Sequence, residues 1–308
     1  MNQSGFRGAI GLRASINALT AALIVGVIMG LALTPDGRGW LRNPTLMLGS
    51  ANASASPPAP QVTAAVARPE PVAPAAPRIT PLSRRLAEGE LVVGVIGDSM
   101  ADGLWTGVYR DLRDVDGVRV VRMAEVSTGL SRYDYVNVQD KTARQLREQP
   151  IDAAVVMFGT NDAQAIEHDG VIHQFGTPGW REIYARRVDD LVGLLRENDV
   201  AVYWVGLPRM KRESFDGRMA QINELVAGRM AALDVPYIDT VALTSNEGGD
   251  YDAYLAASDG RRRLMRAHDG IHMSMAGYLR LTEPVTERLR ADAGLNRIMD
   301  GAADGAAG

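Results

Sequence analysis

Three short polar segments carry the side chains that acyl transfer by a serine nucleophile needs: Gly97-Asp98-Ser99-Met100, Gly159-Thr160-Asn161-Asp162 and Asp269-Gly270-Ile271-His272. A serine hydroxyl becomes a good nucleophile when a neutral imidazole removes its proton, and a carboxylate can fix the tautomer of that imidazole. Ser99 is therefore the candidate nucleophile, His272 the base and Asp269 the orienting carboxylate. Only two residues separate Asp269 from His272, so one turn can present both side chains to Ser99.

Acyl transfer also needs hydrogen-bond donors for the negative charge that develops on the substrate oxygen. Ser99 opens a predicted helix, where free N–H groups and the positive end of the helix dipole favour an anion. The candidate oxyanion hole consists of the N–H of Ser99, the N–H of Gly129 and the carboxamide of Asn161. Gly129 lies in a fourth polar segment, 127–132, and its missing Cβ would let the backbone approach a substrate closely.

Other polar residues flank these segments. We expect Asp98 and Asp162 to bond nearby backbone N–H groups and to organise the loops rather than to transfer protons. The polar, glycine-containing segment 246–267 precedes Asp269 and is a candidate flap over the site. The residues that we select as candidate substrate contacts are Arg132, Tyr133, Arg209 and His268.

The spacing of apolar residues predicts the elements that must position these segments. Short, continuous apolar runs are typical of strands in a parallel sheet that is covered on both faces. Segments with apolar residues at helical spacing alternate with these runs. The predicted strands are 91–97, 118–123, 151–158, 200–207 and 235–239, and the predicted helices are 100–112, 141–149, 180–197, 218–233 and 275–291.

This alternation predicts one α/β domain over residues 82–296, a three-layer doubly wound parallel sheet with helices on both faces. Such sheets bind their ligands beyond the carboxyl ends of the strands. The polar segments around Ser99, Gly129 and Asn161 each follow a predicted strand, and the segment around His272 precedes the last helix. We therefore expect all four segments to meet at one edge of the sheet.

The N-terminal part predicts export. Residues 14–33 form an uncharged, mostly apolar run, and ~20 such residues suffice to span a bilayer as a helix. Arg7 and Arg13 precede the run, which predicts that residues 1–13 are cytoplasmic. We expect a single transmembrane signal anchor in a bacterial inner membrane, with the catalytic domain in the periplasm. A cleaved signal peptide, and hence a secreted protein, is the alternative.

The segments on either side of the domain have a different composition. Residues 34–81 are rich in alanine and proline, which predicts a disordered periplasmic linker that holds the domain away from the bilayer. Residues 297–308 are rich in glycine, alanine and aspartate, which predicts a flexible tail.

The composition excludes several classes of site. The 308 residues include no cysteine, so a disulfide framework, a thiolate metal site and a cysteine nucleophile are ruled out. A net charge of −4 argues against a nucleic-acid partner, which would require a clustered basic face. The four histidines are too few to predict a site built on several imidazoles: His168, His173, His268 and His272.

Together, the four polar segments resemble the blocks of the SGNH (GDSL-like) hydrolase superfamily, with Ser99, Gly129, Asn161 and His272 at the four matching positions. The resemblance covers residues 88–293. It implies a flavodoxin-like sheet and esterase or acetyl-transfer activity without a metal or another cofactor. The segment around Gly129 lacks the asparagine that often accompanies this glycine. The segments 127–132, 204–208 and 266–278 are similar to a bacterial cell-envelope branch of the superfamily with little assigned biochemistry.

We therefore expect an exported, membrane-anchored serine esterase that removes acyl groups, O-acetyl above all, from cell-envelope or extracellular polysaccharide. Its partners would be an acylated glycan or another small ester and, through the N-terminal helix, the inner membrane; the sequence predicts no oligomeric state. Alternatives are a polysaccharide O-acetyltransferase with the same triad and a non-catalytic envelope protein that binds polysaccharide. A metal-dependent phosphoesterase, suggested by Asp98, Asp102 and Asp162, is a further alternative.

Overall fold

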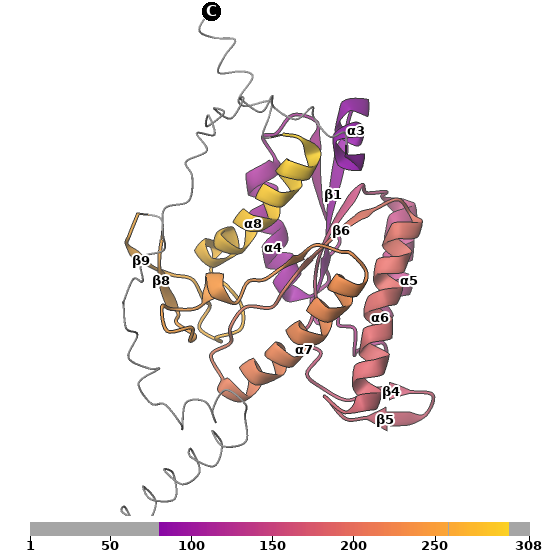
Figure 1. Ribbon diagram of the computed structural model, residues 1–308, viewed down its shortest axis with the longest axis vertical. Helices are drawn as coiled ribbons and strands as arrows, with labels where there is room; N and C mark the ends of the chain where they lie inside the picture. The colour runs from indigo at the N-terminus through magenta and orange to yellow at the C-terminus, as the bar shows by residue number, and fades with distance from the viewer. Residues whose placement is uncertain (1–79, 258, 296–308) are drawn as a thin grey trace, which may run out of the picture. The chain divides into compact units, whose positions relative to one another are not determined.

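The computed structural model describes residues 80–257 and 259–295, which form an α/β domain (Figure 1). The predicted anchor at 14–33, nearly all of the predicted linker and the predicted tail at 297–308 lie outside the described residues. Within the described part of the chain, no helix is both long and apolar enough to cross a membrane.

A five-stranded parallel sheet forms the centre of the domain, in the order β2-β1-β3-β6-β7. This is the flavodoxin-like order that the resemblance implies. All residues of β1 and β3, the two strands that precede Ser99 and Asn161, are buried, as continuous apolar runs predict. The strands are β1 (Leu91–Gly97), β2 (Val118–Arg122), β3 (Ala153–Met157), β6 (Ala201–Val205) and β7 (Tyr237–Ile238).

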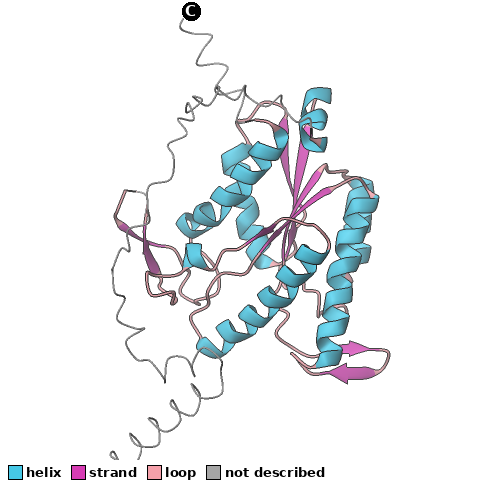
Figure 2. Cartoon of the chain, viewed as in Figure 1, coloured by secondary structure: helices cyan, strands magenta, loops and turns pink. Residues whose placement is uncertain are grey.

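Helices cover both faces of the sheet, which confirms the predicted three-layer architecture (Figure 2). Helices α3, α4 and α8 pack together on one face, and α5, α6 and α7 on the other. Side chains of Thr80, Asp98 and Ser274 cap the N-termini of α3, α4 and α8 by accepting backbone N–H bonds. The helices are α3 (Pro81–Glu88), α4 (Ser99–Leu112), α5 (Val138–Glu148), α6 (Pro178–Glu197), α7 (Glu213–Ala232) and α8 (Met275–Ala293).

Several short elements differ from the prediction. Pro81, which we assigned to the linker, is the first residue of α3. His168 and His173 lie in a hairpin, and the candidate flap 246–267 also contains a hairpin. Strands of three residues are too short for a side-chain period to reveal them. The added elements are β4 (Ile166–His168), β5 (Val171–His173), the 3₁₀ helix η2 (Ala242–Thr244), β8 (Tyr254–Ala256) and β9 (Arg262–Leu264).

Glycines on α4 allow α8 to pack directly on its backbone. A Cβ atom at Gly103 would lie 1.9 Å from Cζ of Tyr278, and one at Gly107 would lie 2.1 Å from Oγ1 of Thr282. This contact matters for the site because α4 begins with Ser99, whereas α8 begins three residues after His272. Close packing of the two helices therefore fixes the separation between the candidate nucleophile and the candidate base.

We predict that Gly103→Ala lowers the free energy of unfolding by about 1–3 kcal/mol, because the added methyl group overpacks the interface with Tyr278. The matched control is Gly228→Ala on α7, where a Cβ atom would meet no atom within 4 Å. Alanine at this control position should be neutral or should stabilise the fold by about 0.5–1 kcal/mol. Urea unfolding followed by circular dichroism measures both changes. Equal effects at the two positions would contradict the packing argument.

Candidate active site

Ser99, His272 and Asp269 form one hydrogen-bonded row, as the sequence predicts for a triad. Ser99 is the first residue of α4, separated from the end of β1 by Asp98 alone, and its Oγ lies 2.8 Å from Nε2 of His272. Nδ1 of the same ring lies 2.7 Å from Oδ2 of Asp269. This pairing favours the tautomer with the proton on Nδ1, which leaves Nε2 free to accept the serine proton. The side chains of His272 and Asp269 are each 38% exposed, so a substrate can reach the row from solvent.

The turn from Asp269 to His272 keeps the carboxylate ionised. Oδ1 of Asp269 accepts the backbone N–H groups of Ile271 and His272 at 2.9 and 3.1 Å, while Oδ2 faces the imidazole. Partial burial acts in the opposite direction, but these hydrogen bonds lower the pKa of Asp269 to about 2. Asp269 is therefore a carboxylate throughout the neutral range, where His272 would act as a base.

Arg266 holds this turn from inside the protein. The residue is only 1% exposed, and its Nη2 donates to the carbonyl oxygens of Ile271 at 2.7 Å and Gly270 at 3.2 Å. Its Nη1 donates to the carbonyl oxygen of Arg209, in the loop after β6. Sequence reasoning did not select Arg266 as a site residue, since an arginine in a polar loop gives no sign that it is buried.

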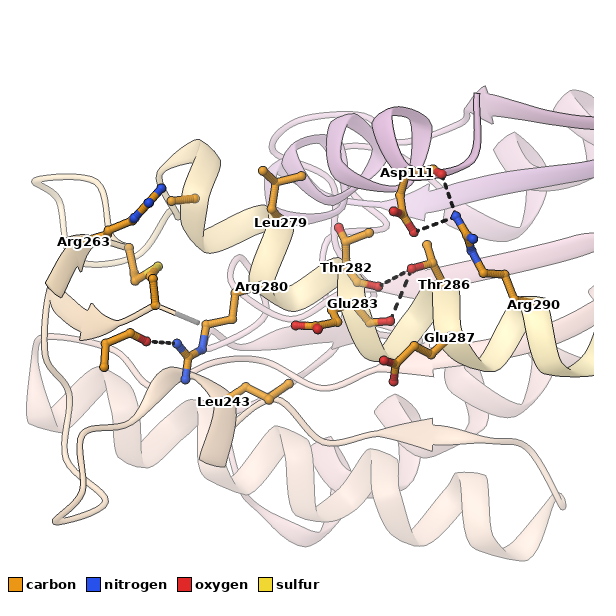
Figure 3. A pocket seen from close by; sticks show the side chains of 14 residues that line it. Asp111, Leu243, Arg263, Leu279, Arg280, Thr282, Glu283, Thr286, Glu287 and Arg290 are labelled. Atoms are coloured by element: carbon orange, nitrogen blue, oxygen red, sulfur yellow. Dashed lines mark hydrogen bonds and ion pairs between the residues drawn. The ribbon is translucent and has the colours of Figure 1, made fainter. Parts of the chain in front are cut away.

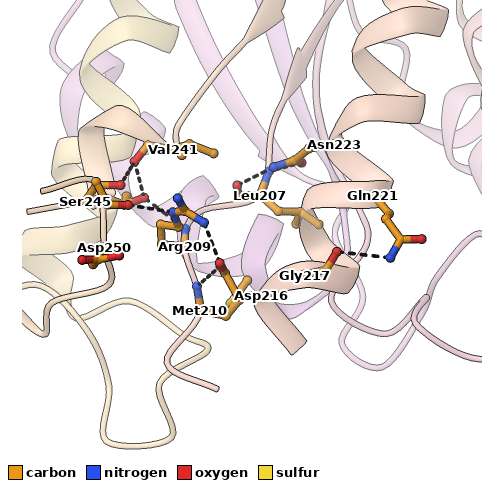
Figure 4. Close-up of polar contacts among 12 residues, drawn as sticks. Leu207, Arg209, Met210, Asp216, Gly217, Gln221, Asn223, Val241, Ser245 and Asp250 are labelled. Carbon is orange, nitrogen blue, oxygen red and sulfur yellow. Dashed lines mark hydrogen bonds and ion pairs between the residues drawn. The ribbon is translucent and has the colours of Figure 1, made fainter. Parts of the chain in front are cut away.

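The loop after β6 is itself held to α7 (Figure 4). Nη1 of Arg209 lies 2.7 Å from Oδ2 of Asp216, and its Nε donates to the carbonyl oxygen of Gly249 at 3.0 Å. The carboxamide of Asn223 donates to and accepts from the backbone of Leu207, both at 2.8 Å. We selected Arg209 as a candidate substrate contact, but its guanidinium is engaged in holding this loop.

The candidate oxyanion donors lie on three different elements. As the first residue of α4, Ser99 has an N–H group without an intrahelical acceptor, and the Asp98 cap binds the N–H of Met100 instead. Nδ2 of Asn161 donates one hydrogen to the carbonyl oxygen of Thr128 at 2.9 Å, which leaves its second hydrogen for a substrate. This bond also ties the Asn161 segment to the residue before Gly129.

The structure gives a second reason for glycine at position 129. A Cβ atom there would lie 2.2 Å from Oδ1 of Asp162. The glycine therefore allows the loop to pack against a buried carboxylate, whereas the sequence suggested only the approach of a substrate. Both reasons are compatible, because the position that a Cβ atom would occupy and the N–H group of Gly129 need not face the same side of the loop.

Asp98 and Asp162 are both fully buried. Asp98 links the segment of Ser99 to that of Asn161, and Asp162 links the segment of Asn161 to that of Gly129. Asp98 accepts the N–H of Met100 at 2.8 Å and the hydroxyl of Thr160 at 2.8 Å, and longer bonds come from the N–H groups of Gly159 and Thr160. These hydrogen bonds hold the loops of the site around Asp98. They also join two segments that lie 61 residues apart in the sequence, so the bonds of Asp98 are not only local.

Asp162 continues this connection to the segment that contains Gly129. Its Oδ1 accepts the N–H and the hydroxyl of Ser131 at 2.8 and 2.9 Å, and its Oδ2 accepts the hydroxyl of Tyr184 at 2.8 Å. Burial raises the pKa of Asp98 to about 6 and also raises the pKa of Asp162, although the hydrogen bonds to both carboxylates act in the opposite direction. The donors to Asp162 come from Ser131 and Tyr184, which are distant in the sequence, rather than from the nearby backbone N–H groups that we expect from the sequence.

The remaining predicted contacts differ in exposure. The hydroxyl of Tyr133 is buried without a hydrogen-bond partner in the described residues, and the guanidinium of Arg187 lies 3.9 Å from the centre of its ring. The hydroxyl of Tyr133 is thus shielded from a substrate, whereas the residue as a whole is half-buried, so its contact with a substrate stays a prediction. His268 is exposed beside Asp269, and Arg132 is half-buried with an exposed hydrogen bond to Ser127, so both remain candidate contacts.

The carboxylates that suggested a metal-dependent phosphoesterase are already engaged with protein donors. Asp98 and Asp162 are buried among N–H and O–H groups, and Asp102 pairs with Arg122. Across residues 80–257 and 259–295, no group of three or more histidine and carboxylate side chains is arranged to hold a metal ion.

A cavity of about 800 Å³ lies elsewhere, along the outer side of α8 (Figure 3). Its lining comes from α8, η2 and the β8–β9 hairpin and includes Leu243, Arg263, Leu279 and Glu283. Arg290 and Asp111, which also line it, lie 3.5 Å apart as an ion pair. Since neither Ser99, Asn161 nor His272 lines this cavity, it is separate from the candidate active site.

Comparison with known proteins gives one family and several similar structures. The model of the family described as "Protein of unknown function (DUF459)" matches residues 92–288. No curated protein sequence matches the chain. One similar structure is a GDSL-like lipase from Bacteroides thetaiotaomicron, at 13% identity and a TM-score of 0.44, over 67% of this chain and 90% of that chain.

Two further similar structures are named as esterases. An aryl esterase from M. smegmatis is 16% identical, with a TM-score of 0.45 over 66% of this chain and 99% of that chain. A mutant of an acetyl-xylooligosaccharide esterase from Geobacillus is 17% identical, with a TM-score of 0.47 over 65% of this chain and 94% of that chain. The assignment of an activity to this chain depends on the geometry of the site.

We predict that the free energy of unfolding falls as the pH rises from about 4 to about 6, by up to about 1.4 kcal/mol per pH unit from Asp98 alone. The pKa of this carboxyl is about 6 in the fold against an ordinary value of 3.8, so in this range the folded chain binds a proton that the unfolded chain has lost. The control is Asp98→Asn, which does not titrate. Urea unfolding at several pH values should give a steeper fall for the wild type, and equal slopes would contradict the prediction.

Proposed function

The chain belongs to the DUF459 family, and we propose that it is a serine esterase. The observation that carries this proposal is the row formed by Ser99, His272 and Asp269, with distances of 2.8 Å and 2.7 Å between its members. A serine, an imidazole and a carboxylate in this order are the working parts of acyl transfer through a covalent intermediate. The row begins at a helix N-terminus, where the developing oxyanion is favoured.

The proposed reaction has two steps. In the first, Nε2 of His272 takes the proton of Ser99 as Oγ attacks the ester carbonyl carbon, and the imidazolium then gives this proton to the alcohol that leaves. In the second, the imidazole removes a proton from a water molecule that attacks the acyl-enzyme, and the acid is released as Oγ recovers its proton. Asp269, ionised throughout the neutral range, stabilises the imidazolium in both steps.

The oxyanion of each tetrahedral intermediate would be bound by donors from three loops. These are the N–H of Ser99, the N–H of Gly129 and the second hydrogen of the Asn161 carboxamide. Because Asn161 is already fixed by its bond to the carbonyl oxygen of Thr128, its remaining N–H needs no reorientation when the charge develops.

For the substrate and the location, we propose O-acyl esters of cell-envelope or extracellular polysaccharide, hydrolysed outside the cytoplasm by a domain anchored through residues 14–33. Support comes from the sequence, where Arg7 and Arg13 precede the apolar run and an alanine- and proline-rich segment follows it. If a sugar hydroxyl instead of water attacks the acyl-enzyme, the same triad performs O-acetyl transfer. Product analysis with and without an acceptor glycan distinguishes the two reactions.

The first test is Ser99→Ala in the full-length chain. We expect turnover of p-nitrophenyl acetate to fall by at least about 10³-fold and labelling by a fluorophosphonate probe to disappear, because the nucleophile is absent. The control is Ser83→Ala in α3, which removes a serine hydroxyl far from the row in the sequence and should change neither result. Activity that persists in Ser99→Ala, or a probe attached to another residue, would contradict the proposal.

The second test concerns the oxyanion hole. Asn161→Ala should lower kcat by about 10²–10³-fold with little change in KM, because the lost hydrogen bond forms to charge in the transition state. Asn198→Ala, which removes an exposed carboxamide beyond the end of α6, is the matched control. Steady-state kinetics with p-nitrophenyl acetate measures both variants. A rise in KM at constant kcat would instead assign Asn161 to ground-state binding.

A further inference from the structure

We infer that the carbohydrate that carries the acyl group is anionic, and that its carboxylate or phosphate groups bind three basic side chains around the candidate active site. These side chains, Arg132, Lys211 and Arg218, are called the cationic rim below. The inference rests on the proposed function and adds the class of substrate to it. Each member of the rim contacts a loop that supplies one part of the site.

Arg132 belongs to the segment that contains Gly129. Its Nη1 donates to the carbonyl oxygen of Ser127 at 2.7 Å, and its guanidinium lies 5.0 Å from the centre of the Tyr135 ring. One hydrogen bond and one aromatic contact thus hold the guanidinium, while most of its five N–H donors stay available. A pre-oriented planar donor of this kind suits carboxylate and phosphate groups.

Arg218 has the same arrangement at the loop that contains Asn161. Its Nη1 donates to the carbonyl oxygen of Ala163 at 3.0 Å, and its guanidinium lies 5.6 Å from the centre of the Phe175 ring. The side chain comes from α7, which follows β6, whereas the Gly129 segment follows β2. In the strand order β2-β1-β3-β6-β7, these two strands lie on opposite sides of β3, which precedes the Asn161 loop. The two arginines therefore flank the proposed oxyanion hole.

Lys211 lies against the turn that contains His272. Its backbone N–H donates to the carbonyl oxygen of Gly270 at 3.1 Å. A Cβ atom at Gly270 would lie 2.3 Å from Cβ of Lys211, so the stem of the lysine packs on this glycine. The residue is exposed and belongs to the loop after β6, and its ammonium group is carried on a flexible stem that passes the turn containing His272.

Most acidic groups near these loops are engaged and do not neutralise the rim. Asp98 and Asp162 are buried among donors, Asp269 faces His272, and Asp216 pairs with Arg209. In the described part of the chain, no member of the rim lies within 4.0 Å of a carboxylate oxygen as an ion pair. The chain as a whole has a net charge of −4, so the positive charge of the rim is opposite in sign to the net charge of the chain.

Two exposed carboxylates oppose the rim. Asp134 follows Arg132 by two residues, and Glu213 opens α7. Arg212, which is also exposed, precedes Glu213 in the sequence and offsets its negative charge. Arg132, Lys211, Arg218 and Arg212 thus outnumber Asp134 and Glu213. A polymer with regularly spaced anionic groups can contact more than one member of the rim at a time.

The experiment compares acetate release from O-acetylated polygalacturonate with release from the same polymer after full methyl esterification of its carboxylates. Exposed ion pairs change an equilibrium by about two- to fivefold each, so we expect kcat/KM to be about tenfold higher for the anionic form at low ionic strength. The preference should shrink at ~0.5 M salt because of screening. O-acetylated dextran with and without phosphate groups forms a second pair, and the larger ratio identifies carboxylate or phosphate as the group that binds.

Variants assign the preference to the rim. Arg132→Gln, Lys211→Gln and Arg218→Gln should each lower the ratio of kcat/KM for anionic and masked polymer by about two- to fivefold. Arg147→Gln is the matched control, since it removes the same charge from the last turn of α5, which precedes β3 and so lies at the opposite edge of the sheet. Equal rates on anionic and masked polymers, or an equal effect of the control, would overturn the inference.

Hydrolysis of p-nitrophenyl acetate in the same protein separates the two possible failures. If this hydrolysis depends on Ser99 while neither anionic polymer is preferred, the inference fails and the proposed function stands. If no ester is hydrolysed in a Ser99-dependent manner, the proposed function fails and the inference fails with it. Thermal unfolding of each variant, expected to match the wild type because the three side chains are at the surface, excludes loss of folded protein as the cause.

Discussion

The burial of two carboxylates behind the site is the constraint on which its geometry depends. A buried charge without partners is strongly destabilising, so Asp98 and Asp162 can remain in the core only while N–H and O–H donors surround them. Apart from the hydroxyl of Tyr184 on α6, those donors belong to the loops and the helix start that follow three neighbouring strands. Satisfying the two carboxylates therefore sets the positions of Ser99, Asn161 and the Gly129 segment relative to one another, before any substrate is considered.

The candidate base, His272, is positioned by other contacts, because it lies near the C-terminal end of the domain and just before the last helix. The packing of α8 on the glycines of α4 sets its distance, and Arg266 sets the conformation of its turn through carbonyl oxygens alone. A fully buried guanidinium has several donors to satisfy, and the turn supplies two of the acceptors. Movement of His272 away from Ser99 would leave these donors unpaired, so the hydrogen bonds stabilise the observed conformation of the turn.

The sequence was sufficient for the features that repeat along the chain or follow from the topology of a parallel sheet. Buried strands read as apolar runs, and the polar segments after them had to meet at one edge, which brought Ser99 near His272. The sequence does not show how neighbouring side chains are oriented. The hydroxyl of Tyr133 is buried, whereas Nη1 of its neighbour Arg132 makes an exposed hydrogen bond to the carbonyl oxygen of Ser127. Three-residue hairpins and the burial of Arg266 likewise depend on tertiary contacts that leave no local pattern.

Negative charge so close to an oxyanion hole raises a physical difficulty for catalysis, because two carboxylates behind Ser99 would repel a developing anion. The same hydrogen bonds that fix the loops also reduce this repulsion, since each carboxylate faces several positive N–H or O–H dipoles. The raised pKa of both groups shows that their ionisation is already disfavoured in the fold. The positive end of α4 and the cationic rim act in the same direction from the solvent side. The local balance of charge at this edge therefore favours an anion, although the chain as a whole is acidic.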